Sequence, residues 1–198
     1  MSPVSAEQRS SRRQFLLVAA LFFVPLAAAA FLYFYSGWRP AVGVQHGELI
    51  DPPRPLPAIE LDLPGGGAAA ADTLRGRWFL VHIVAGSCDE RCLAVLAELR
   101  RLRFALDKDA PRVQRVLLHA GLCCDTGSPA VEPDLLVLAA TGPEGEAFRA
   151  LFPAAADGGP GIYIVDPHGN LMMSYPATGA AHGMLKDLER LLRLSTIG

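Results

Sequence analysis

The sequence predicts an α/β domain that follows a single membrane-spanning helix. Three observations support this prediction: a long uncharged stretch near the start, an apolar strand pattern that runs into a helix, and further strands and helices in alternation after it. The chain has 198 residues, of which 51% are hydrophobic and 19% are charged. This length suits one domain with a short tail.

The overall charge argues against one large class of function. The chain has 18 lysines and arginines against 20 acidic residues, a formal net charge of −2. Nucleic-acid binding requires a basic surface, so we expect no nucleic-acid partner. The 4 cysteines are too few for a disulfide scaffold, and the domain must therefore fold by burying an apolar core.

Residues 15–35 are predicted to form a transmembrane anchor. They contain no charge, and as a helix they would span roughly 30 Å, the thickness of a bilayer core. Arginines precede the stretch, so the positive-inside rule places residues 1–14 in the cytoplasm. We therefore expect a single-pass protein of the bacterial inner membrane, whose domain lies in the periplasm, where thiols oxidise.

A cleaved export signal is the alternative for the same stretch. The sequence Ser11-Arg12-Arg13-Gln14-Phe15-Leu16 looks like a twin-arginine signal, and Ala27 to Ala30 would supply small residues for cleavage. We favour the uncleaved anchor because the stretch is long and aromatic residues gather at its far end. A helix buried in a soluble protein would need an apolar core on every side.

Residues 36–76 are predicted to form an extended segment. Prolines recur along it and break any helix, and Gly65-Gly66-Gly67 follow. Residues 47–57 are more apolar than a free linker, which favours contact with the domain. Residues 59–63 alternate apolar and polar side chains as a short strand does.

Residues 77–198 are predicted to form the periplasmic domain. Near-continuous apolar runs predict buried strands, and apolar stripes of helical period predict helices. The expected strands are 78–84, 112–120, 135–139, 161–166 and 171–175, and the expected helices are 88–106, 144–152 and 181–194. Apart from the short strand at 135–139, their order, β-α-β-α-β-β-α, is that of a thioredoxin-like α/β sandwich.

Cys88 and Cys92 stand at the start of the first predicted helix of the domain. A separation of four places both sulfurs on one helical face, with about 5–6 Å between Cβ atoms. The pair can therefore form a disulfide or share a metal ion. Cys88 is nearer the helix N-terminus, which favours its thiolate. We predict a redox pair or a metal site, with a purely structural disulfide as the alternative.

The buried strand, the turn and the Cys-x-x-x-Cys pair on a helix, behind one anchor, resemble the SCO family. The resemblance covers about residues 72–194. It implies a thioredoxin fold and a membrane protein that helps to assemble the copper centre of cytochrome c oxidase. The implied partner is an oxidase subunit or another periplasmic thiol or copper protein, and the implied cofactor is copper bound by Cys88 and Cys92.

One departure from the SCO pattern concerns the third copper ligand. SCO proteins add a histidine to the two cysteines, and the matching position here is Gly158. The third ligand is thus unknown, and copper would bind two thiolates alone or recruit another histidine. The candidates are His82, His119, His168 and His182. The neighbours Cys123 and Cys124 are expected to be thiols that would join a metal site only if the fold brings them near Cys88.

Pro160 suggests redox chemistry. Its spacing from Gly169 resembles that of the cis-proline in membrane-tethered thiol reductases of the TlpA/ResA kind, where this proline faces the cysteines. The resemblance implies a cis bond before Pro160 and a general periplasmic thiol–disulfide oxidoreductase. A non-catalytic binding module that keeps the fold is the remaining alternative.

Overall fold

The computed structural model describes residues 6–35, 43–64, 66–70, 72–86, 88–121, 134–154 and 161–198. The chain divides into two compact units, Met1–Val44 and Gln45–Gly198. We describe each unit separately.

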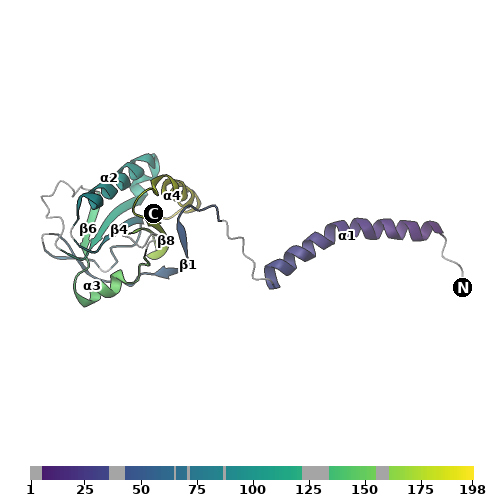
Figure 1. The fold of residues 1–198 in the computed structure, drawn as a ribbon, viewed down its shortest axis with the longest axis horizontal. Coiled ribbons are helices and arrows are strands. Elements are labelled where there is room, and N and C mark those ends of the chain that lie inside the picture. Colours follow the sequence, from purple (N-terminus) through teal and green to yellow (C-terminus); the bar gives the residue numbers. More distant parts are fainter. Residues whose placement is uncertain are drawn as a thin grey trace. The chain divides into compact units, whose positions relative to one another are not determined.

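Among its described residues, the first unit contains one helix, α1 (Ala6–Tyr35) (Figure 1). Within it, Arg12–Leu32 is a stretch of 21 residues that is long and apolar enough to cross a membrane. Its apolar side chains face outward, as shown by Leu21, which is 74% exposed. The predicted apolar helix is confirmed, and its exposed side chains speak against a helix buried in a soluble core.

The second unit is built on one eight-stranded sheet with the order β1-β8-β7-β4-β5-β6-β2-β3. The strands β4, β5 and β6 are parallel, whereas β7, β8 and β1 pair antiparallel. Their bounds are β1 (Glu48–Pro55), β2 (Leu61–Asp62), β3 (Ala68–Ala69), β4 (Trp78–Val84), β5 (Val113–His119), β6 (Leu135–Ala139), β7 (Gly161–Val165) and β8 (Asn170–Pro176). This mixed sheet confirms the predicted thioredoxin-like fold.

Helices cover both faces of the sheet. The helices are α2 (Glu90–Ala105), α3 (Gly142–Arg149) and α4 (Ala181–Leu194), with a 3₁₀ helix at Asp107–Arg112. Figure 1 shows α2 and α4 together on one side of the sheet and α3 on the other. Side chains alternate along β4, so that Leu80 packs with α2 and α4 while Phe79 packs in the opposite cluster.

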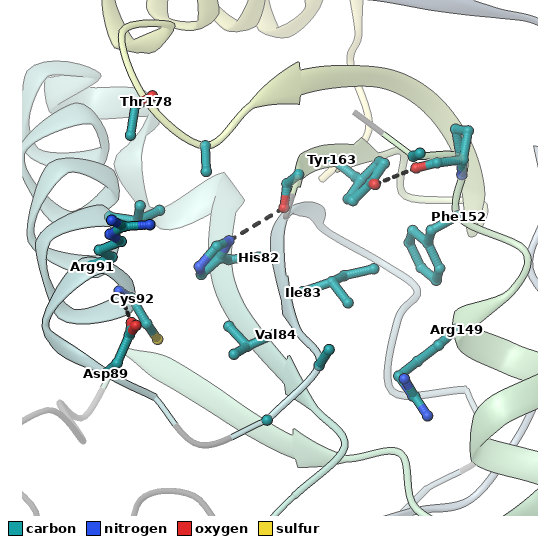
Figure 2. A pocket seen from close by; sticks show the side chains of 17 residues that line it. His82, Ile83, Val84, Asp89, Arg91, Cys92, Arg149, Phe152, Tyr163 and Thr178 are labelled. Carbon is teal, nitrogen blue, oxygen red and sulfur yellow. Dashed lines mark hydrogen bonds between the residues drawn. The ribbon is translucent and has the colours of Figure 1, made fainter. Parts of the chain in front are cut away.

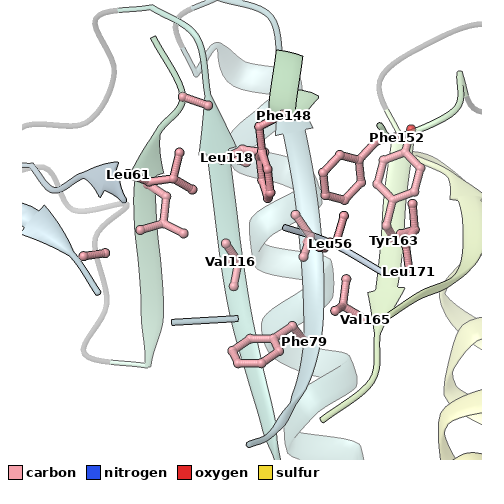
Figure 3. Close-up of a cluster of buried hydrophobic side chains, with 14 of the residues drawn as sticks. Leu56, Leu61, Phe79, Val116, Leu118, Phe148, Phe152, Tyr163, Val165 and Leu171 are labelled. Carbon is pink, nitrogen blue, oxygen red and sulfur yellow. The ribbon is translucent and has the colours of Figure 1, made fainter. Parts of the chain in front are cut away.

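The cluster on the α3 side brings three aromatic rings together (Figure 3). Phe152 contacts Phe148 and Tyr163 edge to face, with ring centroids 5.6 and 5.1 Å apart. Such pairs add to the stability that apolar burial provides. This packing fixes the end of α3 against β7 and so shapes one wall of the pocket described below.

The extended segment contributes strands to the same sheet. β1 pairs with β8, and β2 pairs with β6 and β3. Ile50 and Leu56 are buried in the core, which explains the apolar side chains of this segment. The compact unit therefore starts at Gln45, ahead of the boundary at residue 77 that the sequence indicates, because prolines obscure the strand pattern of β1.

Candidate functional site

The cysteine pair lies where β4 ends and α2 begins. Asp89 is the N-cap of α2, and its carboxylate accepts a hydrogen bond from the backbone N–H of Cys92 at 3.0 Å. The helix therefore starts at Glu90, and Cys88 precedes it. The expectation that both cysteines lie on the first helical turn is corrected in this respect, because the strong capping residue stands between them.

Cys88 and Cys92 are joined by a disulfide, and their Cα atoms are 5.2 Å apart. This separation lies in the ordinary range for disulfides. The side chain of Cys92 is only 4% exposed, whereas Cys88 is partly buried. Cys88 is therefore the sulfur that an incoming group reaches more easily.

A pocket of about 910 Å³ opens beside Cys92. Figure 2 shows it between Cys92 and Arg91 of α2 on one side and Phe152, Tyr163 and Arg149 on the other. Its lining is largely apolar, with the two arginines as cationic groups. A volume of this size accommodates a small molecule or a few side chains of a protein partner.

His82 on β4 lies in the same pocket (Figure 2). It is 1% exposed, and its Nδ1 lies 3.2 Å from the carbonyl oxygen of Gly161. A carbonyl only accepts hydrogen bonds, so Nδ1 carries the proton and Nε2 is left as an acceptor. Burial lowers the pKa of His82 and outweighs the hydrogen bond to Gly161, which raises it. The ring is therefore neutral at neutral pH.

The other candidate histidines occupy different places. His119 on β5 is buried, with its Nδ1 2.7 Å from the carbonyl oxygen of Gly121. His168 in the turn between β7 and β8 is exposed, and so is His182 on α4. Among the residues that the structure describes, no three His, Cys, Asp or Glu side chains are grouped so that they could hold a metal ion.

Several residues singled out in the sequence lie outside the described residues. They are Gly158, Pro160, Cys123 and Cys124. The cis bond before Pro160 therefore stays a prediction, as does any role of the neighbouring cysteine pair.

Sequence reasoning did not anticipate the pocket. Arg149 and Phe152 reach it only because α3 packs against the sheet, and no local pattern announces that packing. His82 did carry a signal. It is a polar residue in an otherwise apolar strand, on the same side as Leu80, which faces α2.

Comparison with known families matches residues 78–195 to the model of the transmembrane-like, thioredoxin-like, C-terminal domain family. The chain belongs to this family. The match includes β4, α2 and the cysteine pair, and it extends to the end of α4. No curated protein matches the chain.

This member of the transmembrane-like, thioredoxin-like family also resembles solved Sco structures. Apo Sco1 from Thermus thermophilus has a TM-score of 0.54 and 19% identity, covering 78% of this chain and 98% of that one. BsSco is described as a Sco-family cytochrome c oxidase assembly protein with a disulfide switch. Its TM-score is 0.53 and its sequence identity is 14%, and the match covers 75% of this chain and 99% of BsSco. Copper-bound yeast Sco1 has a TM-score of 0.52 and a sequence identity of 18%, and the match covers 72% of this chain and 96% of yeast Sco1. These likenesses show a shared fold.

Proposed function

We propose that this chain is a membrane-anchored, Sco-like assembly factor for cytochrome c oxidase that acts by thiol–disulfide exchange. The observation that carries the proposal is the Cys88–Cys92 disulfide beside an open, largely apolar pocket. The likeness to a member of the Sco family of oxidase assembly proteins supports the biological setting. The partner is a cysteine-bearing subunit of the oxidase.

The exchange starts from the reduced pair. The thiolate of Cys88 attacks one sulfur of a disulfide in the partner, and the partner's other sulfur leaves as a thiolate. The sulfur of Cys92 then attacks that of Cys88, which forms the Cys88–Cys92 disulfide and releases the partner's second sulfur. The partner gains two electrons and two protons, and a dithiol protein on the same side of the membrane reduces the pair again. Cys88 attacks first because it is less buried than Cys92.

The topology belongs to the same proposal. Residues 1–14 lie in the cytoplasm, residues 15–35 span the inner membrane, and the extended segment of residues 36–76 lies in the periplasm with residues 77–198, to whose sheet it contributes β1, β2 and β3. The apolar stretch in α1 supports the anchor. The arginines before it support the orientation, because basic residues favour the cytoplasmic side.

Copper handling is the second role that the SCO resemblance implies. Cu(I) prefers thiolate ligands, which this pair offers only when it is reduced. Among the described residues, the pair is not part of any group of three His, Cys, Asp or Glu side chains that could hold a metal ion. These residues do not fit a copper site with three donors, so we assign thiol exchange rather than copper transfer to this pair.

Trapping the mixed disulfide tests the proposed function. The full-length Cys92→Ser variant, expressed in cells that assemble cytochrome c oxidase, cannot resolve the bond between Cys88 and its partner. We expect an oxidase subunit to be trapped, and to be lost in the matched Cys88→Ser variant.

The identity of the trapped protein separates the alternatives. Many unrelated periplasmic proteins in place of an oxidase subunit would indicate a general thiol–disulfide oxidoreductase. The absence of any mixed disulfide would contradict the exchange chemistry and leave a binding module.

A further inference from the structure

We propose that His82 accepts the proton of Cys92 when Cys92 attacks the mixed disulfide at Cys88. This inference rests on the proposed function, since it assigns a role within the same exchange. The S–H bond of Cys92 breaks, its proton moves to Nε2 of His82, and the sulfur forms the bond to Cys88. The partner's sulfur leaves as a thiolate and takes up the proton from His82.

The fold places His82 on the correct side of the sheet. Side chains alternate along β4, and Leu80, two residues earlier, packs in the cluster that contains Val95 and Leu99 of α2. His82 therefore faces α2 as well, and it lines the same pocket as Cys92. In Figure 2 its ring lies between the N-terminal end of α2 and β7.

The ring is held in the tautomer that the role requires. The hydrogen bond from Nδ1 to the carbonyl oxygen of Gly161 leaves the lone pair on Nε2. The lowered pKa of His82, caused by burial, keeps this nitrogen unprotonated at neutral pH. A neutral imidazole with one fixed N–H is suited to receive a proton directly or through one water molecule.

Cys92 needs such an acceptor more than Cys88 does. It is 4% exposed, and burial in apolar surroundings favours the thiol over the thiolate. Its own backbone N–H is taken up by the carboxylate of Asp89, which adds a negative charge beside it. The usual help of a helix N-terminus is thus reduced at this sulfur.

Among the described residues, five other ionisable side chains line the pocket with His82. They are Asp89, which is the N-cap of α2, Arg91 and Cys92 of α2, Arg149 of α3 and Tyr163 of β7. The proposed step moves a proton between two of these groups, from Cys92 to His82.

The pH profile of the second exchange step tests the proposal. The full-length reduced chain, in detergent and with Cys123→Ser and Cys124→Ser in every sample, reacts with dithiobis(nitrobenzoate). The first chromogenic thiolate is released when the mixed disulfide forms, and the second when the other cysteine resolves it. We expect the second phase of the parent chain to vary little between about pH 6.5 and 8. In His82→Asn and His82→Gln it should slow by at least about tenfold at pH 7 and become proportional to hydroxide concentration.

His119 provides the matched control. It is also a buried histidine whose Nδ1 lies near a backbone carbonyl, but it does not line the pocket. His119→Asn should leave the pH profile unchanged. If both His82 variants fold, as judged by circular dichroism, and keep the parent profile, the inference is wrong while the exchange function stands. If the parent chain shows no second phase, the proposed function itself fails.

Discussion

The carboxylate of Asp187 on α4 accepts a hydrogen bond from the backbone N–H of His46, 141 residues earlier in the chain, at 2.8 Å. It also accepts from the backbone N–H of Gly47 at 3.0 Å and the hydroxyl of Tyr175 at 2.9 Å. The ring Nδ1 of His46 lies 3.2 Å from the other carboxylate oxygen. These four residues form what we call the Asp187 cluster, which fastens the approach to β1 onto α4.

Removal of the central carboxylate should destabilise the domain. Asp187 is 5% exposed, and Asp187→Ala leaves the hydroxyl of Tyr175 and two backbone N–H groups without their acceptor. We expect the free energy of unfolding to fall by about 3 kcal/mol. Urea unfolding of the full-length chain in detergent measures this change. Glu189→Ala, at an exposed position of the same helix, is the control and should change it by less than about 0.5 kcal/mol.

Stability should also depend on pH through Asp187. Burial alone would raise its pKa, but hydrogen bonds from His46, Gly47 and Tyr175 outweigh burial, and the net pKa lies below the ordinary value. The stabilisation is therefore complete above the ordinary pKa of about 4 and is lost as the pH falls through the lower folded-state pKa. Unfolding measured at several pH values should show a steeper loss below about pH 4 in the parent chain than in Asp187→Asn. Equal slopes would contradict this assignment.

Gly183→Ala should destabilise the domain, although this substitution usually stabilises a helix. Alanine in place of glycine within a helix normally stabilises it by about 1 kcal/mol. At Gly183, however, a Cβ atom would lie 2.5 Å from the Cβ of His46. We expect a net destabilisation of about 1–2 kcal/mol. In a His46→Gly background the same substitution should lose its penalty, and a double-mutant cycle from thermal or urea unfolding measures the coupling.

The charge of Asp89 should slow thiolate formation at the pair. Asp89→Asn keeps the N-cap, because asparagine caps as well as aspartate, but it removes the negative charge next to Cys92. An interaction of this kind is worth about 0.3–1 kcal/mol, so the rate of thiol alkylation at pH 7 should rise by up to about fivefold. Glu90→Gln, which alters a charge without touching the cap, serves for comparison. If Glu90→Gln raised the alkylation rate more than Asp89→Asn does, the charge of Asp89 would not be the one that controls thiolate formation.

Copper binding should depend on the redox state of the pair. We expect the oxidised full-length chain to compete no better for Cu(I) than the Cys88→Ser, Cys92→Ser double variant, because a disulfide offers no thiolate. Titration against a chromogenic Cu(I) chelator measures this. If the reduced chain binds Cu(I) far more tightly than the double variant, our assignment of thiol exchange in preference to copper transfer is overturned.

The strongest sequence patterns predicted their elements closely. The strand expected over 78–84 is β4 with the same bounds, since a short, nearly continuous apolar run is typical of a strand buried on both faces. α2 begins two residues later than predicted, because Asp89 caps it and stands between the two cysteines.

Tertiary contacts account for most of what the sequence did not predict. Arg149 lines the pocket only because α3 packs against the sheet, and the local sequence of α3 does not reveal this packing. The position of Asp187 in the sequence does indicate a buried carboxylate with partners. It falls on the buried stripe of α4, three residues after Met184 and next to Leu188, where a charged side chain requires partners.

β1 forms one border of the sheet, beside β8. Pro52, Pro53 and Pro55 lie within it and have no N–H to offer. A border strand with free N–H groups recruits strands from other polypeptides and starts aggregation. The proline-rich border therefore disfavours extension of the sheet by strands from other copies of the chain.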